Sequence, residues 1–305
     1  MTHTSPHTHP HPHAAHGHTS AHGHVPPAGP GAGDVGDQAG LLDLEADVFA
    51  EHIASVTAWL PVGSAPRHIV DLGCGTGAGT FALLARWPEA RITAVDASAE
   101  HLRRLREKAC ERGLEDRVHT VRADLDAPWP DLGTPDLVWA SASLHHMAEP
   151  DRTLRRVHEL LAPGGLFAVV ELAGFPRFLP GTAPETRPGV EERCHAALAH
   201  RHAEHVPHRG ADWGPRLTGA GFTVEGERTD TLHVDGTGNE AVGRYAVDAL
   251  RRLRGSAADA LPAEDLDALD RLLDTAGPHS VLRRADLAAR TERTVWAARR
   301  GEVSG

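Results

Sequence analysis

The sequence predicts an α/β protein in which a mainly parallel β-sheet is covered by helices on both faces. Short apolar runs alternate with segments of helical periodicity between residues 67 and 171. A glycine-rich turn follows the first apolar run, where a strand would pass into a helix. The chain has 305 residues, enough for one large core with elaborations.

The first forty residues (1–40) are predicted to form a disordered, His-rich tail. They hold nine of the 23 histidines, separated mainly by Pro, Gly, Ser and Ala, and almost nothing that could seed a core. Imidazole binds Zn²⁺ and Ni²⁺ well, so weak metal binding by the tail is chemically reasonable. The candidate ligands are His7, His9, His11 and His13. A solubilising segment with incidental metal affinity is the simpler interpretation.

A helix is expected over residues 41–60, ahead of the sheet. Leu41, Leu44, Val48, Ile53 and Val56 recur at helical spacing and would form one apolar face. Because such a face must be buried, the segment 41–66 is interpreted as a cap on the core of a domain that runs over 41–305.

The predicted core spans residues 67–172, with strands and helices in alternation. Strands are expected at 67–72, 91–95, 118–122, 135–140 and 166–171, and helices at 79–87, 99–112 and 151–161.

The pattern changes after residue 171, where a Pro- and Gly-rich loop begins. Helices are expected near 190–205, 213–220, 240–254 and 263–275, with strands near 222–227 and 293–298. The segments 175–210 and 238–285 are interpreted as lid insertions over one end of the sheet, because loops there carry specificity in such folds.

Composition narrows the class of partner and the compartment. Thirty-one basic against 42 acidic residues give a net charge of −11, which argues against nucleic acid or an anionic membrane as the main partner. No run of about 18 apolar residues and no secretory signal is present, so we expect a soluble, cytoplasmic protein with a small-molecule ligand. Three scattered cysteines suit reduced structural thiols better than a disulfide framework. The oligomeric state stays open.

The glycine-rich turn is the strongest local signal. Gly73, Gly75 and Gly77 let the backbone approach a ligand without collisions of Cβ atoms. The segment also fits the GxGxxA dinucleotide pattern, which leaves an NAD(P)-dependent oxidoreductase as an alternative. Asp71 disfavours that alternative, because a carboxylate would repel a pyrophosphate and can instead hold an ammonium group. Asp96 closes the next strand, where it can accept both hydroxyls of a ribose.

Together these motifs resemble those of the class I S-adenosylmethionine-dependent methyltransferases, most closely the small-molecule branch of quinone-biosynthesis and natural-product enzymes. VDLGCGTG at 70–77 resembles the first motif, AVDAS at 94–98 the ribose-binding strand end, and RADLDAPWP at 122–130 the adenine-contacting turn. The fourth and fifth strands and the helix before strand six also match, in PDLVWASASLHHM, LLAPGGLFAVVEL and DWGPRLTGAGF. The resemblance implies a Rossmann-like sheet of seven strands in the order 3-2-1-4-5-7-6, with the last strand antiparallel.

The resemblance also implies the cofactor, S-adenosylmethionine, the product S-adenosylhomocysteine, and no required metal. Carried over by position, the cofactor would rest on the three glycines, with Asp71 at its methionine end, Asp96 at the ribose, and Ala97 and Ser98 against the adenosine. Asp124 would accept the adenine amino group, Leu125 would pack on the ring, and Ser141 would lie near the methionyl part.

The implied reaction is in-line transfer of the sulfonium methyl group to an oxygen, nitrogen or carbon of a small acceptor. Residues 141–146 lack both the Asn/Asp-Pro-Pro-Tyr motif of amino-directed nucleic-acid enzymes and the carboxylates of metal-dependent catechol-type enzymes. His145 and His146 stand at the exit of the fourth strand, where either could be a general base or part of the pocket wall. Glu171, Trp213, Tyr245 and His279 are further pocket candidates. A non-catalytic accessory or sensor protein that binds S-adenosylmethionine or metal is the alternative function.

Overall fold

The structure of the chain is a computed structural model that describes residues 32–302, with side chains from Gln38 onward. The candidate tail ligands His7, His9, His11 and His13 lie outside the described residues, so metal binding by the tail stays a prediction. Within residues 32–302, no helix is both long enough and apolar enough to cross a membrane.

Seven strands form one sheet in the order β3-β2-β1-β4-β5-β7-β6, which confirms the predicted topology. The first five are parallel, and β7 runs antiparallel to both of its neighbours, β5 and β6. The strands are β1 (His68–Leu72), β2 (Arg91–Asp96), β3 (Val118–Arg122), β4 (Leu137–Ser141), β5 (Leu166–Leu172), β6 (Phe222–Asp235) and β7 (Ala288–Arg300). Most residues of β1, β4 and β5 are buried, because helices cover both faces of the sheet, and this explains their continuous apolar runs.

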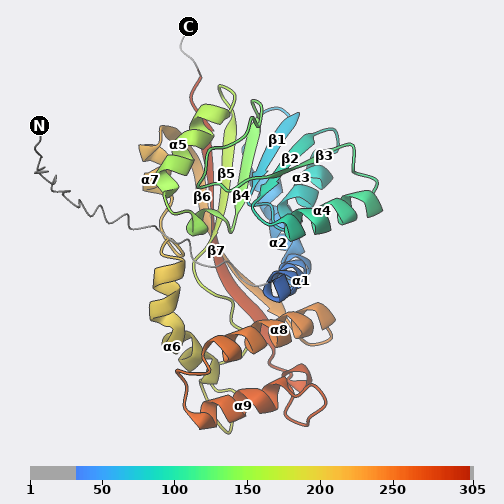
Figure 1. Cartoon of the computed structure of the whole chain (residues 1–305), viewed down its shortest axis with the longest axis vertical. Helices are drawn as coiled ribbons and strands as arrows, with labels where there is room; N and C mark the ends of the chain where they lie inside the picture. The colour runs from blue at the N-terminus through green and yellow to red at the C-terminus, as the bar shows by residue number, and fades with distance from the viewer. Residues whose placement is uncertain (1–31, 303–305) are drawn as a thin grey trace, which may run out of the picture.

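Helices pack on both faces of this sheet (Figure 1). One face carries α2 (Ala50–Trp59), α3 (Ala78–Arg86) and α4 (Ala99–Glu111), and the other carries α5 (Pro150–Leu160) and α7 (Gly214–Gly219). Leu83 of α3 packs with Trp139 on the first face, and Val157 of α5 packs with Val138 on the second.

The predicted cap helix over 41–60 is two helices in the structure. α1 (Ala32–Val48) and α2 meet at Phe49, which is buried and leaves the helical conformation with φ −107° and ψ 21°. The helical spacing of apolar residues continues across this break, because each of the two helices buries one apolar face. The two apolar faces pack against different helices: α1 packs on α8 (Glu240–Ser256), whereas α2 packs on α3.

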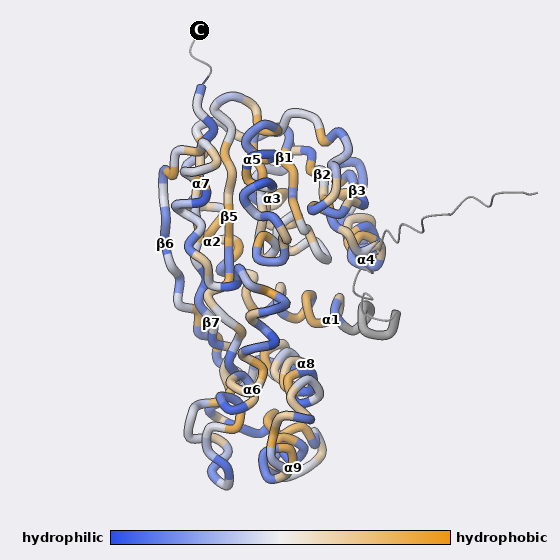
Figure 2. The backbone as a smooth tube through the Cα atoms, turned by 60° about the vertical axis from the view of Figure 1, so that its left-hand side comes forward, coloured by the Kyte–Doolittle hydropathy of each residue, from blue (hydrophilic) through white to orange (hydrophobic). Residues whose placement is uncertain are grey.

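The strands β6 and β7 are much longer than the predicted 222–227 and 293–298. They form a hairpin that runs beyond the rest of the sheet to a lower lobe built from α6 (Val190–His205), α8 and α9 (Ala263–Leu273) (Figure 1). The apolar pattern in the sequence underestimates the length of β6, because only Phe222 is buried and the remaining positions alternate between partly buried and exposed. Figure 2 shows this strand as largely hydrophilic. The segments predicted as insertions, 175–210 and 238–285, supply the helices of this lobe.

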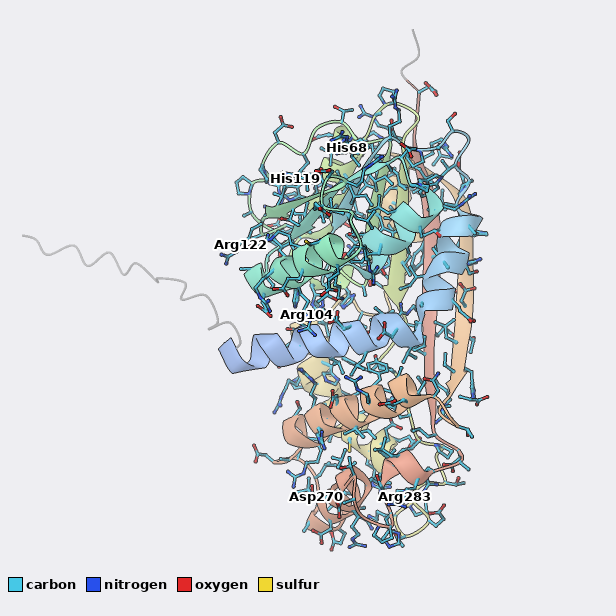
Figure 3. The ribbon with its side chains drawn as sticks, turned by 90° about the vertical axis from the view of Figure 1, so that its right-hand side faces the viewer. His68, Arg104, His119, Arg122, Asp270 and Arg283 are labelled. Carbon is cyan, nitrogen blue, oxygen red and sulfur yellow. The ribbon has the colours of Figure 1, made fainter. Side chains whose placement is uncertain are left out.

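The first helix, α1, lies between the sheet domain and the lower lobe (Figure 3). Asp43 of α1 accepts a hydrogen bond from Arg104 of α4 at 2.7 Å and pairs with Lys108 of the same helix. On its other side, α1 packs against α8. The helix therefore joins the two parts of the molecule and closes the space between them.

Candidate functional site

The turn after β1 is shaped by its glycines. Gly73, Gly75 and Gly77 all have positive φ angles, of 68°, 53° and 98°, which side chains rarely adopt. A Cβ atom on Gly73 would lie 2.4 Å from Cβ of Ser143, so the turn also needs glycine in order to pack against the exit of β4. At Gly77 a Cβ atom would lie 2.8 Å from Phe81, inside the protein. Gly77 thus serves helix packing, whereas Gly73 and Gly75 face a cavity.

This cavity has a volume of about 440 Å³ and opens at the carboxyl ends of β1, β2 and β4. Nine of the residues predicted for the site line it: Asp71, Gly73, Gly75, Asp96, Ala97, Asp124, Leu125, Ser141 and His146. Gly77, Ser98 and His145 do not. Leu42, Glu45 and Ala46 of α1 close the cavity from the side of the lower lobe.

Asp71 presents a buried carboxylate to the cavity. Thr80 donates a hydrogen bond to it at 2.6 Å, and no cationic side chain within residues 38–302 forms an ion pair with it. Burial raises the pKa of Asp71 to about 7, although the hydrogen bond from Thr80 opposes this change. A buried carboxylate without a counter-ion is suited to a ligand that brings a positive charge.

Asp96 is held by the turn itself. One carboxylate oxygen, Oδ2, accepts the backbone N–H of Gly75 at 2.9 Å, and Oδ1 accepts that of Ser98 at 2.8 Å and lies 3.2 Å from Nδ1 of His101. Burial raises the pKa of Asp96, but these hydrogen bonds outweigh it and the pKa falls below its usual value. Oδ1 already has two hydrogen-bond partners, whereas Oδ2 has one and can accept another donor. Asp96 therefore has room for one ribose hydroxyl at Oδ2, rather than for the two hydroxyls that the sequence predicts.

The turn after β3 forms the next wall. Leu125 is buried, while Asp124 is exposed at the rim of the cavity and accepts the backbone N–H of Asp126 at 2.9 Å. The carboxylate of Asp126 accepts the N–H of Ala148 at 3.0 and 3.1 Å, which ties this turn to the segment after β4. Ser98 lies outside the cavity and caps α4, where its hydroxyl accepts the N–H of His101 at 3.2 Å.

The two histidines after β4 have different surroundings. His145 is buried, with Nδ1 2.6 Å from Glu171 and Nε2 3.0 Å from Arg209. An arginine only donates, so Nε2 of His145 accepts from Arg209 and Nδ1 carries the proton that is donated to Glu171. Both ring nitrogens are therefore occupied, and His145 does not reach the cavity. This placement does not favour the predicted role of His145 as a general base.

Glu171 holds the loop that follows β4. Besides His145, it accepts the backbone N–H groups of Ser143 at 3.1 Å and Leu144 at 2.7 Å. The sequence marks Glu171 as a pocket candidate, yet it lies behind this loop and outside the cavity of 440 Å³.

His146 is exposed on the cavity surface, and its ring centroid lies 4.2 Å from that of His145. Desolvation by the surrounding protein nevertheless lowers its pKa to about 4, and the positive charge of Arg209 acts in the same direction. At neutral pH the imidazole is uncharged and only weakly basic.

The cavity also contains polar residues that the sequence analysis missed. Nε1 of Trp139 and Nε2 of His101 are buried without a hydrogen-bond partner among the described residues, and both side chains line the cavity. Arg293 of β7 lines it too and pairs with Glu45 of α1 at 2.5 Å, while its Nε has no partner in the described part of the chain. The place of His101 one turn after the Ser98 cap is a usable signal, but nothing local marks Arg293.

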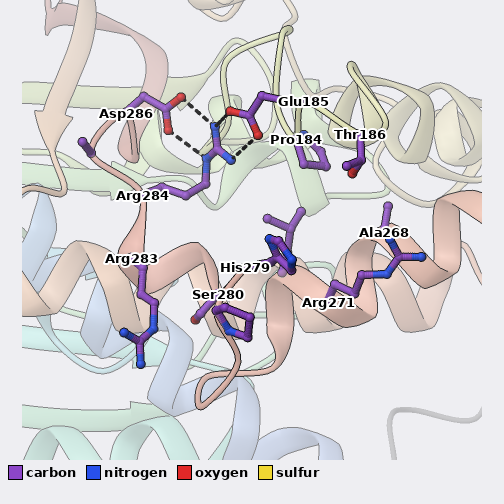
Figure 4. Close-up of a pocket in the computed structure, with 13 residues that line it drawn as sticks. Pro184, Glu185, Thr186, Ala268, Arg271, His279, Ser280, Arg283, Arg284 and Asp286 are labelled. Atoms are coloured by element: carbon purple, nitrogen blue, oxygen red, sulfur yellow. Dashed lines mark hydrogen bonds and ion pairs between the residues drawn. The ribbon is translucent and has the colours of Figure 1, made fainter.

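Three further pocket candidates lie elsewhere. Trp213 is buried in the core beside Leu217 and does not line the cavity. Tyr245 is buried against Phe49, with ring centroids 6.3 Å apart. His279 lines a separate cavity of about 520 Å³ in the lower lobe, where Arg284 pairs with Glu185 and Asp286 (Figure 4). In the described part of the chain, no group of three or more His, Cys, Asp or Glu side chains could hold a metal ion.

The sheet order and the cavity beside the glycine turn define a Rossmann-like α/β protein of the methyltransferase type. A methyltransferase domain family matches residues 70–167. The trans-aconitate 2-methyltransferase of Mycolicibacterium gilvum (strain PYR-GCK) is 35% identical over 229 residues, which cover 72% of this chain and 82% of that protein. The chain belongs to the class I S-adenosylmethionine-dependent methyltransferases.

Other similar proteins agree with the fold or with part of the chain. The trans-aconitate 2-methyltransferase of Paracidovorax citrulli (strain AAC00-1) is 40% identical over 107 residues, 35% of this chain and 39% of that protein. The chain thus spans about two fifths of the length of the first relatives it matches. A crystal structure from Bacillus halodurans C-125, described as a methyltransferase, superposes with a TM-score of 0.51 at 16% identity and covers 82% of this chain and 98% of that chain.

Proposed function

We propose that the protein transfers the methyl group of S-adenosylmethionine to a carboxylate oxygen of a small-molecule acceptor. The observation that carries this proposal is the state of the two histidines at the exit of β4. Both ring nitrogens of His145 are occupied, and the pKa of His146 is about 4. A hydroxyl acceptor would have to lose a proton, whereas a carboxylate is already ionised at neutral pH. The relatives named trans-aconitate 2-methyltransferases support the same class of acceptor.

The residues of the cavity fit the cofactor. The buried, unpaired carboxylate of Asp71 would hold its ammonium group, and Asp96 would accept a ribose hydroxyl at Oδ2. Leu125 would pack on the adenine, with Asp124 at the rim, and the unpartnered Nε1 of Trp139 offers a hydrogen bond to an acidic group. When bound, S-adenosylmethionine supplies a methyl group that its sulfonium has already activated.

Arg293 would orient the acceptor. Its side chain lines the cavity, and because its Nη2 is engaged by Glu45, its unpartnered Nε is the atom that would donate a charge-assisted hydrogen bond to a carboxylate. The carboxylate oxygen attacks the methyl carbon as the carbon–sulfur bond breaks, and its electron pair goes to sulfur. The products are a methyl ester and S-adenosylhomocysteine. Alignment of the reactants and exclusion of water can supply about 7–11 kcal/mol of the reduction in barrier.

The proposal is tested with labelled S-adenosylmethionine and a panel of trans-aconitate, other small carboxylic acids, phenols and amines. We expect label in a carboxylic acid, in a product from which alkali releases methanol. Arg293→Gln should raise KM for the acceptor at least tenfold and change the affinity for S-adenosylmethionine much less. Label in an alkali-stable product would contradict the carboxylate proposal. Binding of the cofactor without transfer to any acceptor would favour the accessory or sensor alternative.

A further inference from the structure

A second group of cationic side chains lies on β7 and on the segment that follows β5, outside the cofactor cavity. Arg177 pairs with Arg290 of β7 in an isolated antiparallel bridge, in which each backbone N–H donates to the other carbonyl at 2.8 Å. Residues paired in this way lie directly opposite each other and project from the same face. Two arginines thus stand side by side, an arrangement that like charges disfavour.

Neither guanidinium is satisfied by the protein. Nη1 of Arg177 and Nη2 of Arg290 are buried and have no hydrogen-bond partner among the described residues. Neither arginine forms a side-chain ion pair with any residue of the described range 38–302. A buried donor without a partner costs free energy, so a pair of them beside a cavity points to a missing acceptor.

The two arginines line an open groove of about 440 Å³, together with Phe175, Thr231 and Thr291. Two other charged or titratable side chains also line this groove. His233 lies opposite Arg290 on β6 and is already paired with Asp235 at 3.0 Å. The carboxylate of Glu292 forms no ion pair with either arginine in the described structure. The groove therefore holds more free donors than acceptors.

The surroundings of the groove add positive charge. Arg209 stacks on Phe175 with its Cζ 4.2 Å from the ring centroid, and its Nε is buried without a partner among the described residues. His195 of α6 lies 5.9 Å from the same ring. Burial, and after it the charge of Arg177, lower the pKa of His195 to about 4, so this imidazole is uncharged at neutral pH and does not compete with an anion for Arg177. The nearby carboxylate of Glu191 is engaged by the N–H groups of Phe178 and Leu179. Burial raises the pKa of Glu191 to about 7. At neutral pH this side chain therefore carries only part of a negative charge, and it compensates the charge of Arg177 incompletely.

We propose that Arg177 and Arg290 form a binding site for a small polycarboxylate, separate from the cofactor cavity. The two adjacent guanidinium groups suit a ligand with two or more carboxylates, since each can donate parallel hydrogen bonds to one of them. Arg209 links this site to the reaction centre, because it also donates to His145 beside the exit of β4. The proposal does not depend on the proposed function, since the site can be tested without a methyl donor.

The test is calorimetry of the full chain with citrate, with acetate as the probe that has a single carboxylate. We expect citrate to bind with a dissociation constant below 1 mM, acetate to bind at least tenfold more weakly, and citrate to raise the thermal midpoint. Arg290→Gln and Arg177→Gln should each weaken citrate binding at least tenfold. Arg155→Gln removes an exposed arginine of α5 and is the matched control, which should bind as the native protein does.

Two further variants make the assignment specific. Arg293→Gln alters the cofactor cavity, and Arg283→Gln alters the lower-lobe cavity (Figure 4). Loss of citrate binding in either of these, with Arg290→Gln and Arg177→Gln unaffected, would place the anion elsewhere and overturn the proposal. Absence of citrate binding by the native protein would overturn it as well. Circular dichroism and the thermal midpoint identify a variant that fails to fold. If Arg177→Gln or Arg290→Gln does so, citrate binding by the other of these two variants decides the test.

Discussion

The carboxylate of Asp71 is buried beneath the cavity and depends on a ligand for its counter-charge. Its pKa of about 7 lies above the usual value, so the free folded protein binds a proton more readily than the unfolded chain does between pH 4 and 7. Its contribution to stability is therefore lost as the pH rises through about 7. A cationic ligand favours the ionised form, and binding of such a ligand releases that proton.

We therefore expect the affinity for S-adenosylmethionine to rise up to about tenfold per pH unit between pH 5.5 and 7, because one proton must leave before the ammonium binds. Calorimetry over this range measures the slope. Asp71→Asn should bind the cofactor more weakly and with little dependence on pH. An equal slope in the native protein and in this variant would exclude Asp71 as the group that titrates.

Separate substitutions of His145 and His146 should have different effects. His145→Ala removes one of the three groups that donate to the buried carboxylate of Glu171, which should lower the free energy of unfolding by about 3 kcal/mol. His146→Ala removes only a weak base from the cavity wall, so kcat should fall less than tenfold. Denaturant unfolding and steady-state kinetics measure these quantities. A fall in kcat beyond a hundredfold for His146→Ala, with cofactor binding intact, would establish this residue as the general base.

At the scale of elements, one acidic side chain of α9 links this helix to α6 across the lower lobe. Asp265 is fully buried and accepts hydrogen bonds from Arg193 of α6, at 2.8 and 2.9 Å, and from Arg187 in the preceding loop, at 2.5 Å. The two hydrogen bonds from Arg193, and then the one from Arg187, lower the pKa of Asp265 to about 2 despite its burial. The ionised form therefore joins α6 to α9.

Asp265→Asn should destabilise the lower lobe by about 1–3 kcal/mol, a range reduced because both arginines are partly exposed. In the native protein this contribution is complete above the unfolded pKa, near 4, and is lost as the pH falls towards 2. Hydrogen exchange of α6 and α9 at pH 7 should show faster opening in the variant. Glu264→Gln, an exposed neighbour on α9, is the control and should exchange at the native rate.

At the scale of the whole molecule, α1 connects two lobes and closes the cavity between them. Leu42, Glu45 and Ala46 line the cavity, while the same helix contacts α4 and α8. Cofactor binding should therefore depend on α1, although this helix lies far from the glycine turn in the sequence.

Removal of residues 1–31 should leave the affinity for S-adenosylmethionine and the thermal midpoint unchanged, and should abolish most retention on a nickel column. Removal of residues 1–49 should weaken cofactor binding at least tenfold, since one wall of the cavity and the Asp43 ion pairs are lost. Calorimetry of the two shortened chains makes the comparison. Equal cofactor affinities would show that α1 takes no part in the site.

The order of the strands is expected only from the resemblance to a known family, and the structure confirms it. The sequence by itself determines the alternation of buried strands and helices in the core, and the cofactor side of the cavity. Both depend on short-range patterns: apolar runs mark the buried strands, and a carboxylate or glycine at a strand end marks a ligand position. Gly73, Asp71 and Asp96 are each found within two residues of such an end. These signals are local, so they can be recognised without any knowledge of distant contacts.

Only the tertiary structure decides the remainder of the site. Arg293 reaches the cavity from β7, more than 200 residues after Asp71 in the chain, and Glu45 meets it from α1. His145 and His146 are neighbours in sequence, yet one is locked between Glu171 and Arg209 while the other faces the cavity. The physical reason is that burial, hydrogen-bond partners and pKa depend on which distant elements pack around a side chain, and local periodicity contains no information about that packing.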